Sequence, residues 1–276
     1  MAIEENPILR KSTESEVEFL SKVKHSNIIR LVRWCNENGE INLVYEYCKQ
    51  GTLETKLINE GILSEEVSLS IFHHLLNAFK VLQENKIMHR DVKPENILLN
   101  DDNWKLADFD FCCKYSQNEK MKEELGSKFY VAPEVNSMNG YDSKCDIWSL
   151  GVVLYRMLFG SVPLEYGDFE EYLEKVGNFV VDFPSDERVK VSERTKTLLL
   201  KMLTADPLKR ISWNELFLYQ RCDIVLDIDK YIFTKRGKIS KKHTVNNKLT
   251  EEQKAILEEA YKHRTSNLPN TKQITI

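Results

Sequence analysis

The chain has 276 residues, enough for one sizeable domain or two small lobes with a real core. Hydrophobic residues make up 42% and charged residues 30%, the balance of an ordinary globular protein. The formal net charge of −4 excludes the dominant basic field of many nucleic-acid and membrane-surface proteins. We therefore expect neither class of partner.

The cysteines and the apolar stretches indicate a protein of the cytoplasm. Six cysteines form no CxxC pair, which favours reduced thiols over a disulfide framework; they stand at positions 35, 48, 112, 113, 145 and 222. Residues 1–12 contain no apolar segment of signal-peptide length. The longest apolar stretch, 147–160, is interrupted by Arg156 and is too short to span a bilayer, so a buried helix fits it better.

The first third of the chain predicts a helix followed by two strands. Residues 12–24 begin with hydroxyl and acidic side chains and place Val17, Leu20 and Val23 on one face, as in an amphipathic helix. The apolar stretches 28–34 and 41–47 flank the polar segment NENGE and predict two short strands.

The rest of the first 221 residues predicts mostly helix around one small hairpin. From Ser64 onward apolar residues recur at helical spacing as far as Leu82. The segments 96–100 and 104–109 flank a polar turn and predict a hairpin that presents Asp108 at its end. From Asp146 onward nearly everything indicates helix, so a small, partly stranded front precedes a larger helical back.

The character of the sequence changes after residue 221. Residues 230–247 are basic, contain no acid and lack clear periodicity. Residues 250–263 open with Thr250 and Gln253 in the pattern of a capping box and predict one short amphipathic helix. We therefore divide the chain into a domain of residues 1–221 and a tail of residues 222–276. The tail is either a solvated extension or a docking or regulatory segment.

The segment HRDVKPEN, residues 89–96, carries the chemistry. Transfer of a phosphoryl group to a hydroxyl needs a base that orients the hydroxyl, a cation that neutralises phosphate oxygens, and metal ligands. Asp91 suits the first role, Lys93 the second and Asn96 the third. Asp108, at the end of the predicted hairpin, could supply the carboxylate that a phosphate-bound magnesium ion requires.

These residues resemble the motifs of eukaryotic protein kinases. The resemblance runs from about residue 12 to about residue 221 and includes HSNIIRL (25–31), LVYEYCKQGTL (43–53), HRDVKPEN, GSKFYVAPE (126–134), DIWSLGVVLY (146–155) and DPLKRIS (206–212). It implies a two-lobed α+β fold with an incomplete N-lobe and a helical C-lobe. Lys93, together with GSKFY, is similar to the serine/threonine class rather than the tyrosine class.

The resemblance also implies a role for each matching residue. Asp91 resembles the catalytic base, Lys93 the γ-phosphate contact, and Asn96 and Asp108 the two magnesium ligands. Further positions resemble the nucleotide contacts: Glu46 and Cys48 in the hinge that meets adenine, Leu98 in the floor beneath it, and Glu16 as the helix glutamate that pairs with a strand lysine. Glu134 and Arg210 resemble a buried ion pair behind the APE segment.

The sequence departs from the family pattern at several positions. No glycine-rich loop and no strand lysine precede residue 12, so we expect the chain as written to bind ATP poorly. Two explanations stay open: a shortened reading of a longer gene, or a short protein that keeps the fold without catalysis. DFG is replaced by Asp108-Phe109-Asp110, and Tyr45 stands just before the hinge. Glu123 stands where many relatives carry a phosphothreonine, and we expect it to pair with Arg90.

The resemblance predicts an enzyme that uses ATP and Mg²⁺ to phosphorylate serine or threonine hydroxyls of protein substrates. The alternative is a catalytically inert pseudokinase that acts as a binding scaffold. Nothing in the sequence indicates an oligomeric state.

Overall fold

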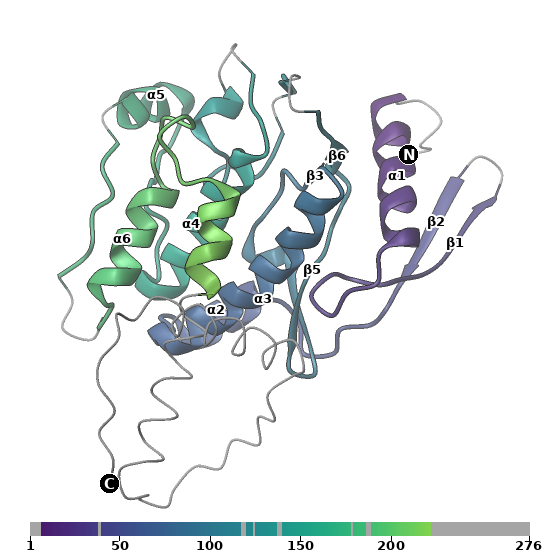
Figure 1. Ribbon diagram of the computed structural model, residues 1–276, viewed down its shortest axis with the longest axis horizontal. Coiled ribbons are helices and arrows are strands. Elements are labelled where there is room, and N and C mark those ends of the chain that lie inside the picture. The colour runs from purple at the N-terminus through teal and green to yellow at the C-terminus, as the bar shows by residue number, and fades with distance from the viewer. Residues whose placement is uncertain are drawn as a thin grey trace, which may run out of the picture. The chain divides into compact units, whose positions relative to one another are not determined.

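The computed structural model describes residues 7–37, 40–116, 120–123, 125–136, 140–177, 179–185 and 189–221. Internal contacts divide the chain into residues 1–217 and 218–276, and each unit is taken by itself. The tail helix predicted over 250–263 lies outside the described residues. The first unit contains α-helices, short strands and 3₁₀ turns, and Figure 1 shows their arrangement.

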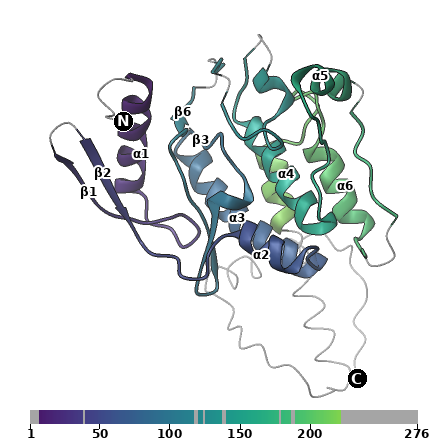
Figure 2. The same ribbon diagram turned by 180° about the vertical axis from the view of Figure 1, so that it is seen from behind.

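The N-terminal part consists of one helix beside one two-stranded sheet. Helix α1 (Pro7–Lys22) begins earlier than predicted and buries Val17 and Leu20, two of the three apolar residues that predict it. Strand β1 (Leu31–Glu37) pairs antiparallel with β2 (Glu40–Tyr45), and Trp34 lies opposite Leu43. Figures 1 and 2 both show α1 alongside this sheet.

The first strand lies about three residues further along the chain than the sequence predicts. Ile28 and Ile29 are fully buried, and this apolar pair made the segment resemble the start of a strand. Their backbone bonds instead to the end of β5 (Asn103–Leu106), where Ile29 N donates to Leu106 O at 2.8 Å and Leu106 N donates to Asn27 O at 2.9 Å. A tertiary contact therefore takes the place of pairing with β2.

The helical part is built on α3 (Glu65–Glu84), and its prediction is confirmed. The hydroxyl of Ser64 accepts a hydrogen bond from Val67 N at 3.3 Å and caps the helix, as its position before an apolar periodic segment predicts. The face that recurs at helical spacing is buried in full: Phe72, Leu75, Leu76, Phe79 and Leu82. The shorter α2 (Leu53–Glu60) precedes it and has Thr52 as its cap.

Helix α4 (Lys144–Phe159) is the centre of the core. It packs against both α3 and α6 (Glu193–Met202), and Figure 2 shows it between them. From Cys145 to Phe159 only Arg156 is not buried. The helix ends at Gly160, whose φ of 80° is the left-handed conformation that glycine adopts without strain. The apolar stretch 147–160 is thus a buried core helix, as predicted.

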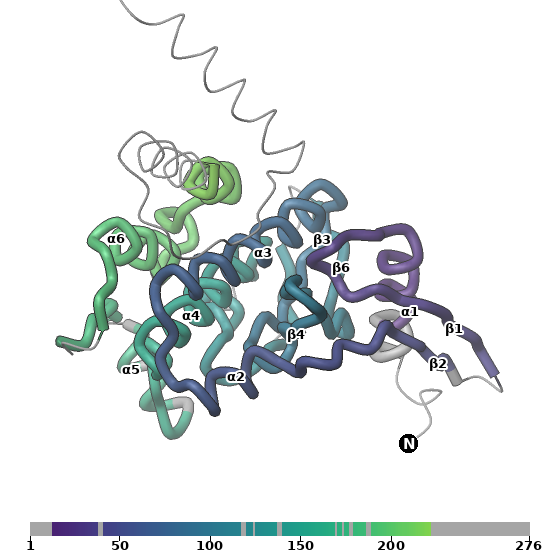
Figure 3. Tube along the Cα trace, turned by 90° about the horizontal axis from the view of Figure 1, so that it is seen from below, coloured from purple at the N-terminus to yellow at the C-terminus, as the bar shows by residue number. Residues whose placement is uncertain are grey.

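The prediction of nearly continuous helix after Asp146 is wrong. Among the described residues of this part, the helices are α4, α5 (Phe169–Gly177), α6 and the helical residues from 213 onward. The chain between these helices is irregular. Pro163, Pro184 and Pro207 lie in the irregular segments, where proline removes a backbone donor and ends helical hydrogen bonding. Figure 3 shows α5 and α6 at the opposite end of this unit from β1 and β2.

A hairpin and a smaller strand pair lie between these two parts. Strand β4 (Ile97–Asn100) pairs with β5 through the turn at Asp101 and Asp102, which confirms the predicted hairpin. Strand β3 (Ile87–Met88) pairs with β6 (Cys113–Lys114). The two 3₁₀ turns, Pro94–Asn96 and Pro133–Asn136, carry parts of HRDVKPEN and APE.

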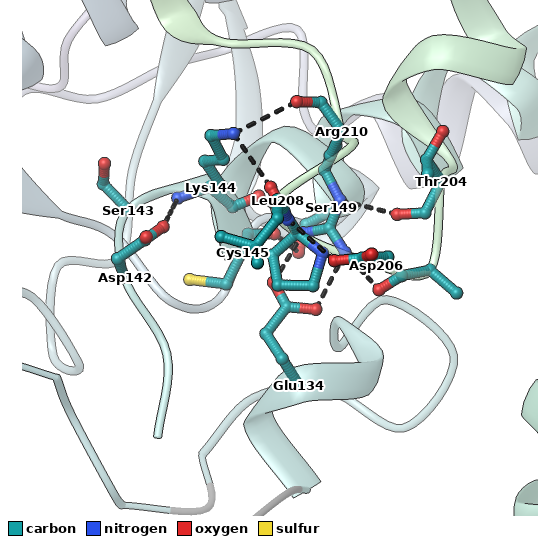
Figure 4. A network of polar contacts seen from close by, with 12 residues as sticks. Glu134, Asp142, Ser143, Lys144, Cys145, Ser149, Thr204, Asp206, Leu208 and Arg210 are labelled. Atoms are coloured by element: carbon teal, nitrogen blue, oxygen red, sulfur yellow. Dashed lines mark hydrogen bonds and ion pairs between the residues drawn. The ribbon is translucent and has the colours of Figure 1, made fainter. Parts of the chain in front are cut away.

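The predicted pairing of Glu134 with Arg210 is confirmed. The guanidinium of Arg210 donates to both carboxylate oxygens of Glu134 (Figure 4), at 2.5 and 2.8 Å. The Arg210 side chain is fully buried. It also donates to the carbonyl oxygens of Thr204 and Lys144, at 2.9 and 2.8 Å. This network fixes the APE turn against the segment that follows α6. None of the described helices is both long and apolar enough to cross a membrane.

Candidate active site

The loop 89–96 is held in place by the buried carboxylate of Asp146. This side chain, at the start of α4, accepts hydrogen bonds from His89 N and Arg90 N, each at 2.8 Å. Burial raises the pKa of Asp146 to about 6, and the two N–H donors act in the opposite direction. Arg90 adopts a φ of 70°, which is uncommon for a residue with a long side chain. Such a conformation persists only where the surroundings enforce it.

His89 supports the loop as a neutral imidazole. It is fully buried, and burial lowers its pKa to about 4. Its Nε2 lies 3.1 Å from Ala107 O, and its Nδ1 accepts from Asp91 N at 3.3 Å. These contacts assign the proton to Nε2, because a neutral imidazole has one donor and one acceptor nitrogen.

The side chain of Asp91 is the centre of a compact polar cluster. Its Oδ2 accepts from Lys93 Nζ at 2.7 Å and from Asn96 Nδ2 at 3.0 Å. Its Oδ1 accepts from Ser127 Oγ at 2.7 Å, and Lys93 Nζ also donates to Ser127 Oγ at 2.8 Å. Asp91 is buried, whereas Lys93 stays partly exposed. The structure thus brings Asp91, Lys93 and Asn96 together around one carboxylate.

Asp108 follows β5 and is exposed, whereas the next residue, Phe109, is buried. The φ of Asp108 is 63°, a left-handed conformation that aspartate tolerates better than most residues. The ring of Phe109 is fully buried and lies 4.8 Å from the ring of His89 and 5.4 Å from that of Phe19. Because Phe109 is packed in the core, it fixes the backbone of the preceding residue, Asp108, at the end of β5.

The electrostatics around Asp108 favour a cation. Partial burial raises its pKa, and the negative charges of Asp110 and Asp91 raise it further. Like charges that oppose one another's ionisation are relieved when a positive ion binds between them. Asp110 replaces the glycine of the family pattern, so it adds a carboxylate at this point.

The oxygen donors at this site fit a magnesium ion. The Nδ2 of Asn96 donates to both the backbone and the side chain of Asp91, at 2.9 and 3.0 Å, which leaves its Oδ1 as an acceptor. Asp108, which is exposed, offers a second oxygen ligand. Magnesium prefers oxygen ligands and is commonly held by one or two protein groups together with substrate phosphates. Within the described residues, no group of three or more His, Cys, Asp or Glu side chains could hold a metal ion by itself.

Glu16 lies on α1 and faces Tyr45 at the end of β2. It is only 1% exposed, and its Oε1 accepts from Tyr45 Oη at 2.6 Å. Burial raises the pKa of Glu16 to about 7; the Tyr45 hydrogen bond lowers it, and the nearby Asp110 and Asp108 carboxyl groups raise it further. Among the described residues, the partner of Glu16 is therefore a tyrosine rather than a lysine.

The residues expected around adenine lie on β4 and after β2. Leu98 is half-buried on β4 opposite Lys105. The Glu46 side chain turns toward Lys105, with Oε1 3.0 Å from Nζ, and Glu46 N donates to Arg30 O at 3.0 Å. Cys48 follows in the segment that leads to α2, where burial raises the pKa of its thiol. The structure places these residues on one segment and one strand but gives none of them a contact with Asp91.

The predicted ion pair of Glu123 with Arg90 is confirmed. The Arg90 side chain is 8% exposed, and its NH1 lies 2.9 Å from Glu123 Oε2. Its Nε donates to Phe111 O at 2.6 Å, and NH1 donates to Tyr141 Oη at 3.3 Å. Tyr141 Oη in turn donates to Glu123 O at 2.8 Å. A fixed carboxylate thus anchors the segment near residue 123 to the loop that carries Asp91.

Sequence reasoning missed three partners of the predicted residues. Ser127 bridges Asp91 and Lys93; the segment GSKFY contains it, but that segment indicated only the kinase class. Tyr45 donates to Glu16, and Lys105 neutralises Glu46. No local spacing could have found the last two pairs, because each joins residues on separate elements.

A model of the protein kinase domain matches residues 2–220. The chain belongs to the protein kinase family. It is 34% identical over 235 residues to serine/threonine-protein kinase ATG1b of Arabidopsis thaliana, a match that covers 83% of this chain and 32% of the relative. It is 35% identical over 214 residues to serine/threonine-protein kinase ULK3 of Mus musculus, covering 76% of this chain and 45% of that kinase.

A third relative is a probable myosin light chain kinase of Dictyostelium discoideum, 33% identical over 205 residues, which cover 74% of this chain and 43% of the relative. The kinase chain thus spans about a third to a half of the length of these curated relatives. The family match and these relatives together identify the chain as a serine/threonine protein kinase domain. The names of these relatives do not favour an inert scaffold.

Proposed function

We propose that this kinase domain transfers the γ-phosphoryl group of Mg·ATP to serine or threonine hydroxyls of proteins. The observation that carries the proposal is the cluster around Asp91, where Lys93, Asn96 and Ser127 all donate to one carboxylate. Phosphoryl transfer depends mainly on positioning and on charge neutralisation, and this cluster supplies groups for both.

Asp91 acts as the base that orients the incoming hydroxyl. Lys93 and Asn96 both donate to Oδ2, so they hold the carboxylate in one rotamer and leave Oδ1 to face Ser127. A substrate hydroxyl that approaches Oδ1 donates its hydrogen bond there and passes its proton to the carboxylate as the phosphoryl group is transferred. Because Lys93 is partly exposed, its ammonium can also reach phosphate oxygens beside Asp91.

Asn96 and Asp108 hold the magnesium ion in this proposal. Asn96 offers its amide oxygen and Asp108 its carboxylate, whose pKa is raised by partial burial and further by the neighbouring acids that a cation would offset. When bound, the ion neutralises phosphate charge as the γ-phosphoryl group moves. Asp110 stands close enough to add negative charge to the same place.

The nucleotide base is proposed to lie between β2 and β4. In this assignment the backbone of Glu46 and Cys48 meets adenine and Leu98 forms the apolar floor. The ion pair of the Glu46 side chain with Lys105 supports the assignment, because it engages the side chain and fixes the backbone that follows β2. That backbone is the part of Glu46 proposed to meet adenine. Glu16 contributes a buried carboxylate on α1, which would accept a cation near the phosphates.

Protein substrates and the cytoplasm complete the proposal. The relatives are named as serine/threonine kinases, which supports hydroxyl acceptors on proteins. All five cysteines among the described residues are free thiols, as expected in a reducing compartment.

The test is transfer of label from γ-labelled ATP to a mixed protein substrate, followed by identification of the labelled amino acid. At saturating ATP, which allows for the weak nucleotide binding expected of this chain, the intact chain is expected to label serine and threonine only with Mg²⁺ present. Asp108→Asn is expected to abolish most of this incorporation, because the amide is a weaker magnesium ligand than the carboxylate. The control is Asp101→Asn, in an exposed turn, which should label normally. Label on tyrosine, or equal labelling by Asp108→Asn, would contradict the proposal.

A further inference from the structure

A concave site lies where the loop after α1, the residue after β2 and strand β5 meet. It is an open cavity of about 280 Å³, lined by Lys24, His25, Ser26, Arg30, Glu46 and Lys105. These residues come from the loop between α1 and β1, from the residue after β2 and from β5. None of them belongs to the loop 89–96, so the cavity is separate from the cluster around Asp91; Glu46 alone is shared with the proposed nucleotide contacts.

The walls of this cavity are preorganised. Asn27 Nδ2 donates to Trp104 O at 2.9 Å, and Asn27 O accepts from Leu106 N at 2.9 Å. Both bonds clamp the loop that carries Lys24, His25 and Ser26 onto β5, whose Lys105 forms part of the floor. A cavity held by such backbone contacts keeps its shape without a ligand, which lowers the cost of binding.

The one acidic group in the lining is already neutralised. Glu46 Oε1 lies 3.0 Å from Lys105 Nζ and accepts from Arg30 N at 2.9 Å, and Oε2 accepts from Asn100 Nδ2 at 3.4 Å. The side chains of Glu46 and Lys105 are only 11% and 10% exposed, so this pair forms the buried floor. Its charges cancel.

Two cations of the lining remain uncompensated. Lys24 and Arg30 are both exposed, and no acid within the described residues lies in an ion pair with either side chain. The cavity therefore presents two positive charges in a protein whose formal net charge is −4. A guanidinium with its planar fork and an ammonium that line the same cavity form the donor set that phosphate groups select.

We propose that this cavity binds the phosphoryl group of a phosphorylated protein segment. A phosphoserine or phosphothreonine carries close to two negative charges near neutral pH, which matches Lys24 and Arg30. The volume exceeds that of a phosphate group and leaves room for bridging waters. The site would dock a protein that has been phosphorylated elsewhere on its chain, whether or not Asp91 acts on it.

A protein segment is favoured over a membrane surface by charge and by shape. Anionic lipids attract clusters of many basic residues, and they repel a protein whose overall charge is negative. The formal charge here is −4 and the two cations stand at a recess with a buried floor rather than on a flat basic face. A single phosphorylated side chain can enter such a recess.

The test is a titration of the ¹⁵N-labelled chain with inorganic phosphate and with a short phosphoserine peptide, in the absence of nucleotide and Mg²⁺. The unphosphorylated peptide is the ligand control. The amides of Ser26, Arg30 and Lys105 are expected to shift and to saturate with phosphate and with the phosphopeptide, but not with the unphosphorylated peptide. Shifts confined to residues 89–96, or spread over basic side chains in general, would overturn the proposal.

Two double variants that each remove two positive charges distinguish binding at the cavity from general electrostatic attraction of the phosphopeptide. Lys24→Gln/Arg30→Gln is expected to weaken binding of the phosphopeptide about tenfold or more, because two charge-assisted contacts are lost. Arg33→Gln/Lys80→Gln removes two exposed cations outside the cavity and should bind within about twofold of the intact chain. Equal weakening in both variants would overturn the site.

Vesicles that contain a phosphorylated inositol lipid provide the last arm of the test. At equal phosphate concentration they are expected to bind no more tightly than the phosphopeptide. Tighter binding to the vesicles, lost in Lys24→Gln/Arg30→Gln, would assign the cavity to a lipid headgroup and overturn its assignment to a protein segment.

Discussion

The helical part of this kinase domain and its N-terminal part differ in how their buried carboxylates are compensated. Around α4 the buried carboxylates are met by donors: Asp146 by two backbone N–H groups, and Glu134 by the guanidinium of Arg210. On α1 the equally buried Glu16 has one hydroxyl partner, Tyr45, and two further acids nearby.

Apolar packing follows the same division. Helix α4 is buried along almost its whole length, whereas Val32, Trp34 and Val44 on the β1–β2 sheet are each about half exposed, at 54%, 48% and 51%. A rigid, compensated scaffold therefore carries the proposed catalytic loop, while the proposed nucleotide side rests on fewer contacts. Regions with few buried apolar contacts are the ones that open most easily.

The largest expected effect is on the buried ion pair of the helical part. Arg210→Met leaves the buried Glu134 without its cation and should lower the free energy of unfolding by about 3–5 kcal/mol. Denaturation in urea measures this. Glu134→Met/Arg210→Met removes both charges and should be less destabilised than the single variant. If Arg210→Met costs less than about 1 kcal/mol, the helical part is not held by this network.

An exposed ion pair that joins α1 of the N-terminal part to β6 sharpens the comparison. Lys114 pairs with Glu18 at 2.6 Å, but both side chains are largely exposed. Lys114→Met should therefore leave the unfolding midpoint unchanged within error, since exposed pairs are screened by water and salt.

The next effect is a pH dependence that arises from Glu16. Because its pKa is raised to about 7, Glu16 contributes stability that is fully present below its unfolded pKa and is lost as the pH rises through 7. The intact chain should thus lose roughly 1–2 kcal/mol relative to Glu16→Gln between about pH 5 and pH 8. Unfolding in urea at several pH values measures the difference.

Tyr45 provides the control for this pH dependence. Its hydroxyl favours the ionised form of Glu16, so Tyr45→Phe should move the loss of stability to higher pH. Parallel pH profiles for the intact chain and Glu16→Gln would mean that Glu16 does not titrate in this range.

A smaller effect is expected where the loop near residue 123 meets the scaffold. Glu123→Lys places two cations together at Arg90 and should lower kcat by roughly fivefold, about 1 kcal/mol in the barrier. Residues 117–126 contain no serine, threonine or tyrosine, so phosphatase treatment should not lower activity through this segment. Glu193→Lys, in an exposed pair on α6, is the control. Equal activity of the two variants would contradict the role of Glu123.

Short-range spacing was sufficient to predict much of the proposed site. Asp91, Lys93 and Asn96 lie in one tight loop, so their separation in sequence already brings them near one another, and the structure shows them in contact. The pairs Arg90–Glu123 and Glu134–Arg210 were predicted by resemblance to kinases and are present. The roles of these residues stay predictions.

Contacts between separate elements could not be predicted from local pattern. The apolar pair Ile28 and Ile29 resembled a strand, but its backbone bonds to Leu106 and the strand begins later. Tyr45 and Lys105 find Glu16 and Glu46 only once the sheet, α1 and the β4–β5 hairpin have packed. The segments after α4 that contain proline are irregular where the sequence predicted helix, because proline removes a backbone donor.

The turnover of Asp91→Asn with Mg·ATP and a protein substrate tests the central proposal most directly. The substitution nearly conserves the side-chain volume but replaces one acceptor oxygen with an NH2 donor and removes the charge that orients the hydroxyl and accepts its proton. We expect kcat to fall by about 10²–10⁴ while the unfolding midpoint stays close to that of the intact chain. A variant that folds normally and retains turnover within about threefold would contradict the assignment of Asp91 as the base.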